Sequence, residues 1–319
     1  MSDDPQAPLF GSDKPTPALT AETALKAAMG VFESHMHNEG FAANTVKAFV
    51  SDVRLLGKYL GIGQPIGGIG TSDLNNFLNW LLYERGVPCS PKSYARRVTT
   101  LKVFFGWLYD SNVLISNPAN GVIQRSVSSP LPNVPTPAQL EQALHVTAEW
   151  LAGKNIRKPD PRPHLLLTLL LQSGIKKGEA MEIVPNHIDR SDPEQPFLFI
   201  RYRNPRLRYK ERKIILDPEW LDVLDNYVGH YYPTDTLFTC TARNLEYILG
   251  DVAEAAGLEK GLLSFENLRW AAALSDLRAG VEPDEIRQKL GLSKVTWRET
   301  KNKLEKLRAR QEQGFAPGS

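Results

Sequence analysis

Cysteine and histidine are both scarce in this sequence. Only Cys89 and Cys240 occur among its 319 residues, together with six scattered histidines. Two cysteines provide neither a disulfide framework nor a CxxC metal pair, and their scarcity is typical of a protein in a reducing cytoplasm. Because a zinc site also needs clustered cysteine or histidine ligands, we expect no metal and no other cofactor.

Long apolar runs are also missing. No stretch of 18 or more apolar residues occurs, so the sequence predicts no membrane-spanning helix and no membrane partner. The first 17 residues are polar and acidic and lack the basic and then apolar order of a signal peptide. We therefore expect a disordered tail over residues 1–19, a short tail over 311–319 and a cytoplasmic location.

Neither acidic nor basic residues are in large excess, and the net charge is +2. The basic residues, however, are clustered along the sequence. Residues 92–102 hold four of them and no acid, residues 201–213 hold seven against one acid, and residues 287–310 hold nine against two. Such clusters on a balanced chain are typical of a surface that binds a polyanion. Each could also be the solvated face of a helix.

Apolar residues recur at helical spacing between residues 20 and 125, which predicts a helical domain. We expect Asn44, and Thr71 or Ser72, to cap two of its helices. The helix expected at 90–109 has an apolar side, and we expect Arg96 and Arg97 to lie off that side. Four prolines in SVSSPLPNVPTP predict an exposed linker over 126–137.

The second domain is expected over residues 138–310. Most of it has helical spacing, but segments rich in Ile and Phe predict strands at 197–202 and 212–216. The expected fold is mainly α with a small antiparallel β-sheet, which makes the C-terminal domain an α+β domain.

Six segments resemble, in family order, the tyrosine recombinases of the phage-integrase family. They are NTVKAFVSDVRLLGKYL, SPKSYARRVTTLKVFFGWLYDSNVLISNPA, LPNVPTPAQLEQAL, LLLQSGIKKGEAMEIVPNHID, RYKERKIILDP and SFENLRWAAALSDLRAGVEPDEIRQKLGLS. The resemblance covers roughly residues 20–305. It implies a helical, SAM-like core-binding domain and a catalytic-fold domain that close on duplex DNA as a clamp.

The family cuts DNA by attack of a tyrosine oxygen on a backbone phosphate, held by two arginines and assisted by a hairpin lysine and by histidine. The resemblance places Lys176 at the first arginine position, and Glu179 matches the family residue that follows it. The hairpin lysine position falls near Leu207, but a shifted hairpin would place Arg206, Arg208 or Lys210 there instead. Sequence alone leaves these alternatives open.

Other family positions are occupied by residues that cannot do the family chemistry. Glu266 stands at a histidine position, Arg269 matches the second arginine, Leu292 stands at the later His/Trp position and Lys301 at the nucleophile. An ammonium group such as that of Lys301 has no free lone pair at neutral pH. Arg269 could instead be a structural arginine, and Lys301 could belong to a solvated helix face.

Two facts do not depend on this alignment. No tyrosine follows Tyr247 and no histidine follows His230, so no shift in register restores the C-terminal nucleophile. The hydroxyls of Ser293, Thr296 and Thr300 lie nearby in sequence without an adjacent histidine base. We therefore expect no catalytic residue, and only a remnant site at Lys176, Glu179, Glu266, Arg269, Leu292 and Lys301.

The sequence thus predicts a DNA-binding protein without strand cleavage, acting as an architectural or regulatory binder or as the partner of an active recombinase. The alternative is a divergent recombinase that takes part in DNA recombination and integration, and a third interpretation is a protein-interaction module. The expected partner is double-stranded DNA, with a second copy or an active recombinase as further candidates and no small-molecule substrate. The expected location is the nucleoid. The expected DNA contacts are Lys47, Lys92, Arg96, Arg97, Lys102, Lys176, Arg206, Arg208, Lys210, Arg269 and Lys301.

Overall fold

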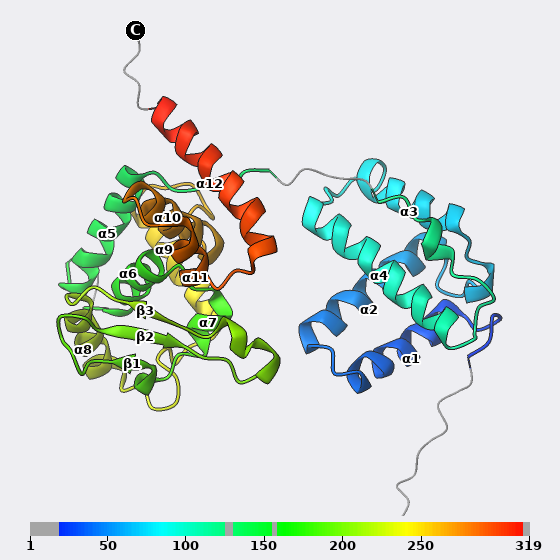
Figure 1. Ribbon diagram of the computed structural model, residues 1–319, viewed down its shortest axis with the longest axis horizontal. Coiled ribbons are helices and arrows are strands. Elements are labelled where there is room, and N and C mark those ends of the chain that lie inside the picture. The colour runs from blue at the N-terminus through cyan, green and yellow to red at the C-terminus, as the bar shows by residue number, and fades with distance from the viewer. Residues whose placement is uncertain (1–18, 125–129, 155–157, 315–319) are drawn as a thin grey trace, which may run out of the picture. The chain divides into compact units, whose positions relative to one another are not determined.

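The computed structural model of the chain describes residues 19–124, 130–154 and 158–314, with side chains as far as Gln311. The chain divides into two compact units between Pro130 and Leu131 (Figure 1). Most of the expected tail at 1–19, residues 125–129 of the region around the expected linker, and residues 315–319 lie outside the described part. None of the described helices is long and apolar enough to cross a membrane.

The described part of the N-terminal unit contains four helices and two short 3-10 turns. These are α1 (Leu25–Asn38), α2 (Ala43–Leu60), η1 (Ile66–Gly68), α3 (Thr71–Tyr83), α4 (Pro91–Asp110) and η2 (Pro118–Gly121). The helices bury one face each around a shared core. In this core the rings of Phe32 and Phe104 pack edge to face, with 5.0 Å between their centroids. The apolar spacing in the sequence therefore corresponds to real buried faces.

Two of the expected helix caps are wrong, because the helices begin one or two residues earlier. Ala42 stands at the N-cap of α2, so Asn44 lies inside the helix. Gly70 stands at the N-cap of α3, and its amide donates to the carboxylate of Asp73 at 2.9 Å. At α4, by contrast, the Ser90 hydroxyl accepts the amide of Ser93 at 3.2 Å, which is an ordinary serine cap.

The C-terminal unit contains eight described helices around a small sheet. They are α5 (Pro137–Leu151), α6 (Arg162–Ser173), α7 (Lys177–Met181), α8 (Trp220–Tyr231), α9 (Ala242–Ala255), α10 (Phe265–Arg278), α11 (Pro283–Lys289) and α12 (Lys294–Gly314). Helix α6 packs against α5, α8, α9 and α10, and it buries Leu165, Leu166, Leu167, Leu169 and Leu170. Such a helix is apolar nearly all round, as expected for the centre of a domain.

The sheet has three antiparallel strands in the order β1 (Ile188–Asp189), β2 (Phe197–Ile200) and β3 (Arg212–Ile215). On its buried face Leu198 lies opposite both Ile188 and Ile214. Strands β2 and β3 agree with the expected segments, while the two-residue strand β1 was not expected. The chain is therefore mainly helical with a small antiparallel sheet, which confirms the predicted fold class.

Helix α12 is amphipathic and packs its apolar side on the C-terminal unit. Trp297, Leu304 and Leu307 join a buried cluster with residues of α10 and α11. Val134, which was expected in an exposed linker, is only 9% exposed and belongs to the same cluster. The helix continues to Gly314, so residues 311–314 are not part of a tail.

Candidate functional site

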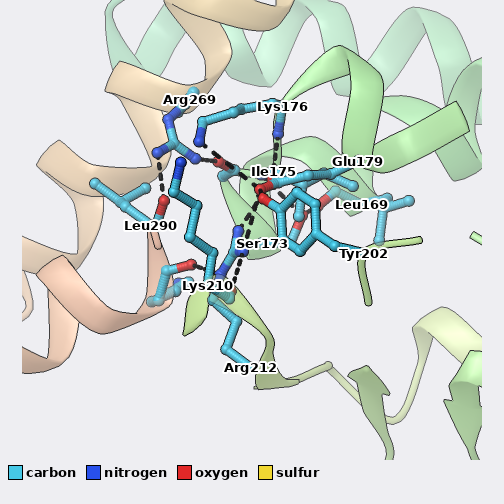
Figure 2. Close-up of polar contacts among 12 residues, drawn as sticks. Leu169, Ser173, Ile175, Lys176, Glu179, Tyr202, Lys210, Arg212, Arg269 and Leu290 are labelled. Carbon is cyan, nitrogen blue, oxygen red and sulfur yellow. Dashed lines mark hydrogen bonds and ion pairs between the residues drawn. The ribbon is translucent and has the colours of Figure 1, made fainter. Parts of the chain in front are cut away.

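Four segments of the C-terminal unit bring polar side chains together at the end of α6 (Figure 2). Helix α6 ends at Gly174 in the left-handed conformation, with φ +58°, and the chain turns there into Lys176 and α7. Glycine adopts this conformation without the penalty that other residues incur. Arg269 comes from α10, while the short 3-10 helix η4 (Pro205–Lys210) and strand β3 supply Lys210 and Arg212.

The centre of the site is the carboxylate of Glu179, which is 6% exposed. It accepts hydrogen bonds from both terminal nitrogens of Arg212 at 3.0 and 3.1 Å, from the amide of Lys176 at 2.8 Å, and from the Tyr202 hydroxyl. Burial alone would raise the pKa of Glu179, but the hydrogen bond and charge of Arg212 outweigh it and lower that pKa to about 2. The carboxylate is therefore ionised at neutral pH.

Arg212 connects this carboxylate to two other parts of the site. Its side chain is 8% exposed, and its Nε donates to the carbonyl of Lys289 at 2.6 Å while Nη1 reaches the carbonyl of Lys210 at 3.2 Å. The guanidinium thus fixes the end of η4 against α11. The sequence interpretation missed both Arg212 and Tyr202 as site residues. Arg212 lies two residues before the buried Ile214 on β3 and therefore on the same face of the strand, so a core-facing arginine was a usable signal.

Arg269 is held by the main chain on both sides. Its guanidinium donates to the carbonyl of Gly174, at the end of α6, and to the carbonyl of Leu290, after α11. Burial lowers the pKa of Arg269 to about 10, so the side chain still carries its charge at neutral pH. A guanidinium has five N–H donors, so three of them remain after these two contacts.

Figure 2 shows Lys176 and Arg269 together, with the Lys210 side chain extending from η4 toward them. Burial lowers the pKa of Lys176, and the charges of Arg269, Lys210 and Arg212 lower it further, while Glu179 opposes them. Lys210 is thus the residue of the hairpin that reaches the site, and Arg206 and Arg208 lie exposed on η4. We call Lys176, Lys210, Arg212 and Arg269 the cation cluster.

Three other residues were expected at the site, namely Glu266, Leu292 and Lys301. Glu266 is exposed in the first turn of α10, and Leu292 packs against the cluster that buries α12. The side chain of Lys301 is 44% exposed, and its nearest described ion-pair partner is Glu305, one turn along α12 at 3.9 Å. Leu292 and Lys301 thus have described contacts outside the cation cluster.

In the N-terminal unit, Arg96 and Arg97 lie against the buried carboxylate of Asp52. Arg96 bonds both oxygens at 2.7 and 2.8 Å, Arg97 approaches at 3.4 Å, and the Thr100 hydroxyl donates at 3.1 Å. Asp52 is 4% exposed, so both arginines pair with a buried carboxylate, while the Arg96 side chain is itself 41% exposed and that of Arg97 is 12% exposed. The DNA contacts expected of Arg96 and Arg97 remain predictions. Lys47, Lys92 and Lys102 are exposed, as DNA-contacting residues must be.

Within the described ranges, no group of three His, Cys, Asp or Glu side chains could hold a metal ion. Two ammonium groups and a guanidinium that face one place can bind the oxygens of a phosphate or another oxyanion.

Several known proteins are similar to this chain. The family model for the phage integrase N-terminal SAM-like domain matches residues 32–112. The tyrosine recombinase XerC of Roseiflexus sp. (strain RS-1) is 24% identical over 284 residues, covering 83% of this chain and 85% of XerC. The chain is thus similar to tyrosine recombinases along most of its length.

Solved structures of tyrosine recombinases share the fold at low sequence identity. The XerH recombinase in a post-cleavage complex with a palindromic difH substrate has a TM-score of 0.67 and 13% identity, covering 93% of this chain and 98% of XerH. A lambda integrase dimer bound to a COC′ core site has a TM-score of 0.66 and 15% identity, covering 87% and 77%. At such identities the likeness extends to the fold, and function must be argued from this chain's own residues.

Proposed function

We propose that this chain, which is similar to tyrosine recombinases, binds duplex DNA and holds a backbone phosphate at the cation cluster without forming a covalent bond to it. The observation that carries the proposal is the convergence of Lys176, Lys210 and Arg269 on one place (Figure 2). Such a binder would act in DNA recombination as an architectural or regulatory protein or beside an active recombinase.

The charge balance at the cluster favours an anion. Glu179 is ionised, but its charge is matched by Arg212, which bonds both of its oxygens. Lys210 and Arg269 then have no carboxylate among their described hydrogen bonds and ion pairs, and Lys176 has only the Glu179 carboxylate that Arg212 already bonds. Lys176 lies 3.9 Å from Glu179, which is too long for a strong hydrogen bond, and its side chain is 43% exposed. A phosphate diester of DNA supplies the missing charge and the acceptor oxygens.

The expected lack of strand cleavage is supported by the residues of α12. Lys301 occupies the nucleophile position of the family, and its ammonium has no free lone pair at neutral pH. The hydroxyls of Ser293 and Thr296 lie 3.0 Å from each other, and the Thr300 hydroxyl donates to the carbonyl of Thr296. Without a histidine base these hydroxyls are weak nucleophiles. Cleavage would therefore need a nucleophile from elsewhere.

Titration of DNA binding with salt tests the proposal. Each phosphate contact releases counterions, so six contacts predict a plot of log affinity against log salt with a slope of about −5. Lys210→Ala should flatten that slope by about 0.9, because it removes one contact. Lys260→Ala removes an exposed lysine outside the cluster and should leave the slope unchanged. An affinity that does not depend on salt, or equal slopes for the Lys210→Ala variant and wild type, would refute the proposal.

A second candidate function is strand cleavage with Tyr202 as the nucleophile. The observation that favours it is the position of the Tyr202 hydroxyl, which donates to Glu179 at the edge of the cation cluster. Burial and then Glu179 raise the pKa of Tyr202 to about 12, so the phenolate that must attack is scarce at neutral pH. We therefore place it second. A covalent adduct with DNA that disappears in Tyr202→Phe would establish this function instead.

A further inference from the structure

Tyr209 is an exposed aromatic side chain beside the cation cluster. It lies in η4, directly before Lys210, and is 74% exposed. The neighbouring Arg206 and Arg208 are exposed as well. An aromatic ring among cations on a protruding turn is a feature that nucleic-acid-binding surfaces use to stack on bases.

The turn that carries this ring is held at both ends. The side chain of Asn204 accepts the amide of Arg206 at 3.0 Å, which caps the first turn of η4. At the other end the carbonyl of Lys210 accepts from Arg212, whose guanidinium is fixed by Glu179. The backbone on both sides of Tyr209 is therefore held, at one end by Arg212 of the cation cluster.

The distance between the ring and the cluster is short on the scale of DNA. The Nζ of Lys210 lies 5.2 Å from the centre of the Tyr209 ring, at one of its faces. Neighbouring phosphates along one strand are separated by a rise of about 3.4 Å. If Lys210 holds a phosphate, the ring lies within about two nucleotides of it, and its exposed side faces the bases or sugars there.

We propose that Tyr209 stacks on a base that is exposed at an interruption of the duplex, so that the protein prefers gapped DNA to intact DNA. In an intact duplex each base is already stacked on both neighbours, and the ring gains little. At a single-nucleotide gap a base face is open, and stacking on an aromatic side chain then adds to the phosphate contact. This inference rests on the proposed function, because it needs Lys210 to contact a phosphate.

Binding of two labelled duplexes, one intact and one with a central single-nucleotide gap, tests the inference. Wild type should bind the gapped duplex about tenfold more tightly, which lies within the range measured for base–aromatic stacking. Tyr209→Ala should remove this preference and leave the affinity for intact duplex within about twofold. Tyr209→Phe keeps the ring and should keep the preference. Tyr247→Ala, which removes another exposed tyrosine of the same unit, should keep it too.

A spectroscopic readout reports the contact directly. A 2-aminopurine placed beside the gap should lose fluorescence when wild type or Tyr209→Phe binds, and should not do so with Tyr209→Ala. Equal affinity of wild type for both duplexes, or a preference that survives Tyr209→Ala, would overturn the inference and leave the proposed function intact. Failure of wild type to bind either duplex would instead refute the proposed function.

Discussion

Replacing Glu179 by glutamine is expected to destabilise the C-terminal unit strongly. The substitution keeps the shape of the side chain and removes the charge that Arg212 bonds at 3.0 and 3.1 Å. Interactions in the folded state lower the pKa of Glu179 from its ordinary 4.5 to about 2. At about 1.4 kcal/mol for each pH unit, this difference corresponds to about 3 kcal/mol of folding free energy at neutral pH. The variant also leaves the guanidinium of Arg212, which is 8% exposed, without a counter-charge.

The contribution of Glu179 to the unfolding free energy depends on pH. The pKa of Glu179 is lower in the folded than in the unfolded chain, so its contribution is fully present above pH 4.5 and is lost as the pH falls toward 2. Glutamine has no such titration. The difference in unfolding free energy between wild type and Glu179→Gln should therefore be about 3 kcal/mol at pH 7 and should shrink over that acid range.

Urea unfolding of the full chain at several pH values measures this difference, and peptide-resolved hydrogen exchange assigns it to the C-terminal unit. Glu182→Gln is a matched control, because Glu182 is 47% exposed and pairs with Arg203, which is 80% exposed. A surface pair of this kind contributes at most about 1 kcal/mol. The reasoning is refuted if Glu179→Gln is as stable as wild type at pH 7, or if the difference stays constant between pH 5 and pH 2.5.

Two further substitutions test the packing around the arginines. Arg96→Ala should destabilise the N-terminal unit by about 2 kcal/mol, because it removes the paired hydrogen bonds to the buried Asp52, and hydrogen exchange of that unit measures the loss. Gly291→Ala should lower the unfolding free energy by about 1–2 kcal/mol, as urea unfolding would show, because Gly291 has φ +58°. Its added Cβ would stand 2.8 Å from Nη1 of Arg212, so DNA binding should weaken as well.

Much of the helical architecture could be predicted because it depends on local spacing. Helix α4 has an apolar face that repeats over many residues, and it was expected at 90–109, within one residue of its observed ends. The two-residue strand β1 carries too little pattern to be recognised, since its pairing with Phe197 and Leu198 is a tertiary contact. The caps expected at α2 and α3 were also wrong. Ala42 and Gly70 stand at these N-caps, and neither has a side-chain oxygen by which a cap is recognised in a sequence.

The candidate site could be predicted only in part. Family spacing indicated Lys176, Glu179 and Arg269, whereas the choice among the hairpin cations needed the structure. Arg212 was missed because its partner Glu179 lies 33 residues away in sequence. The pairing of Arg96 with Asp52 was not expected for the same reason, because Asp52 lies 44 residues earlier and on a different helix.

A nicked duplex that makes cleavage irreversible tests the central claim most directly. The full chain would be incubated with this substrate at low salt, and one portion would be run on a native gel and another on a denaturing gel. The account predicts a shifted band on the native gel and no protein–DNA band on the denaturing gel, because no C-terminal tyrosine follows Tyr247 and Lys301 stands at the nucleophile position. A covalent band on the denaturing gel would contradict it, and its loss in Tyr202→Phe would identify the nucleophile.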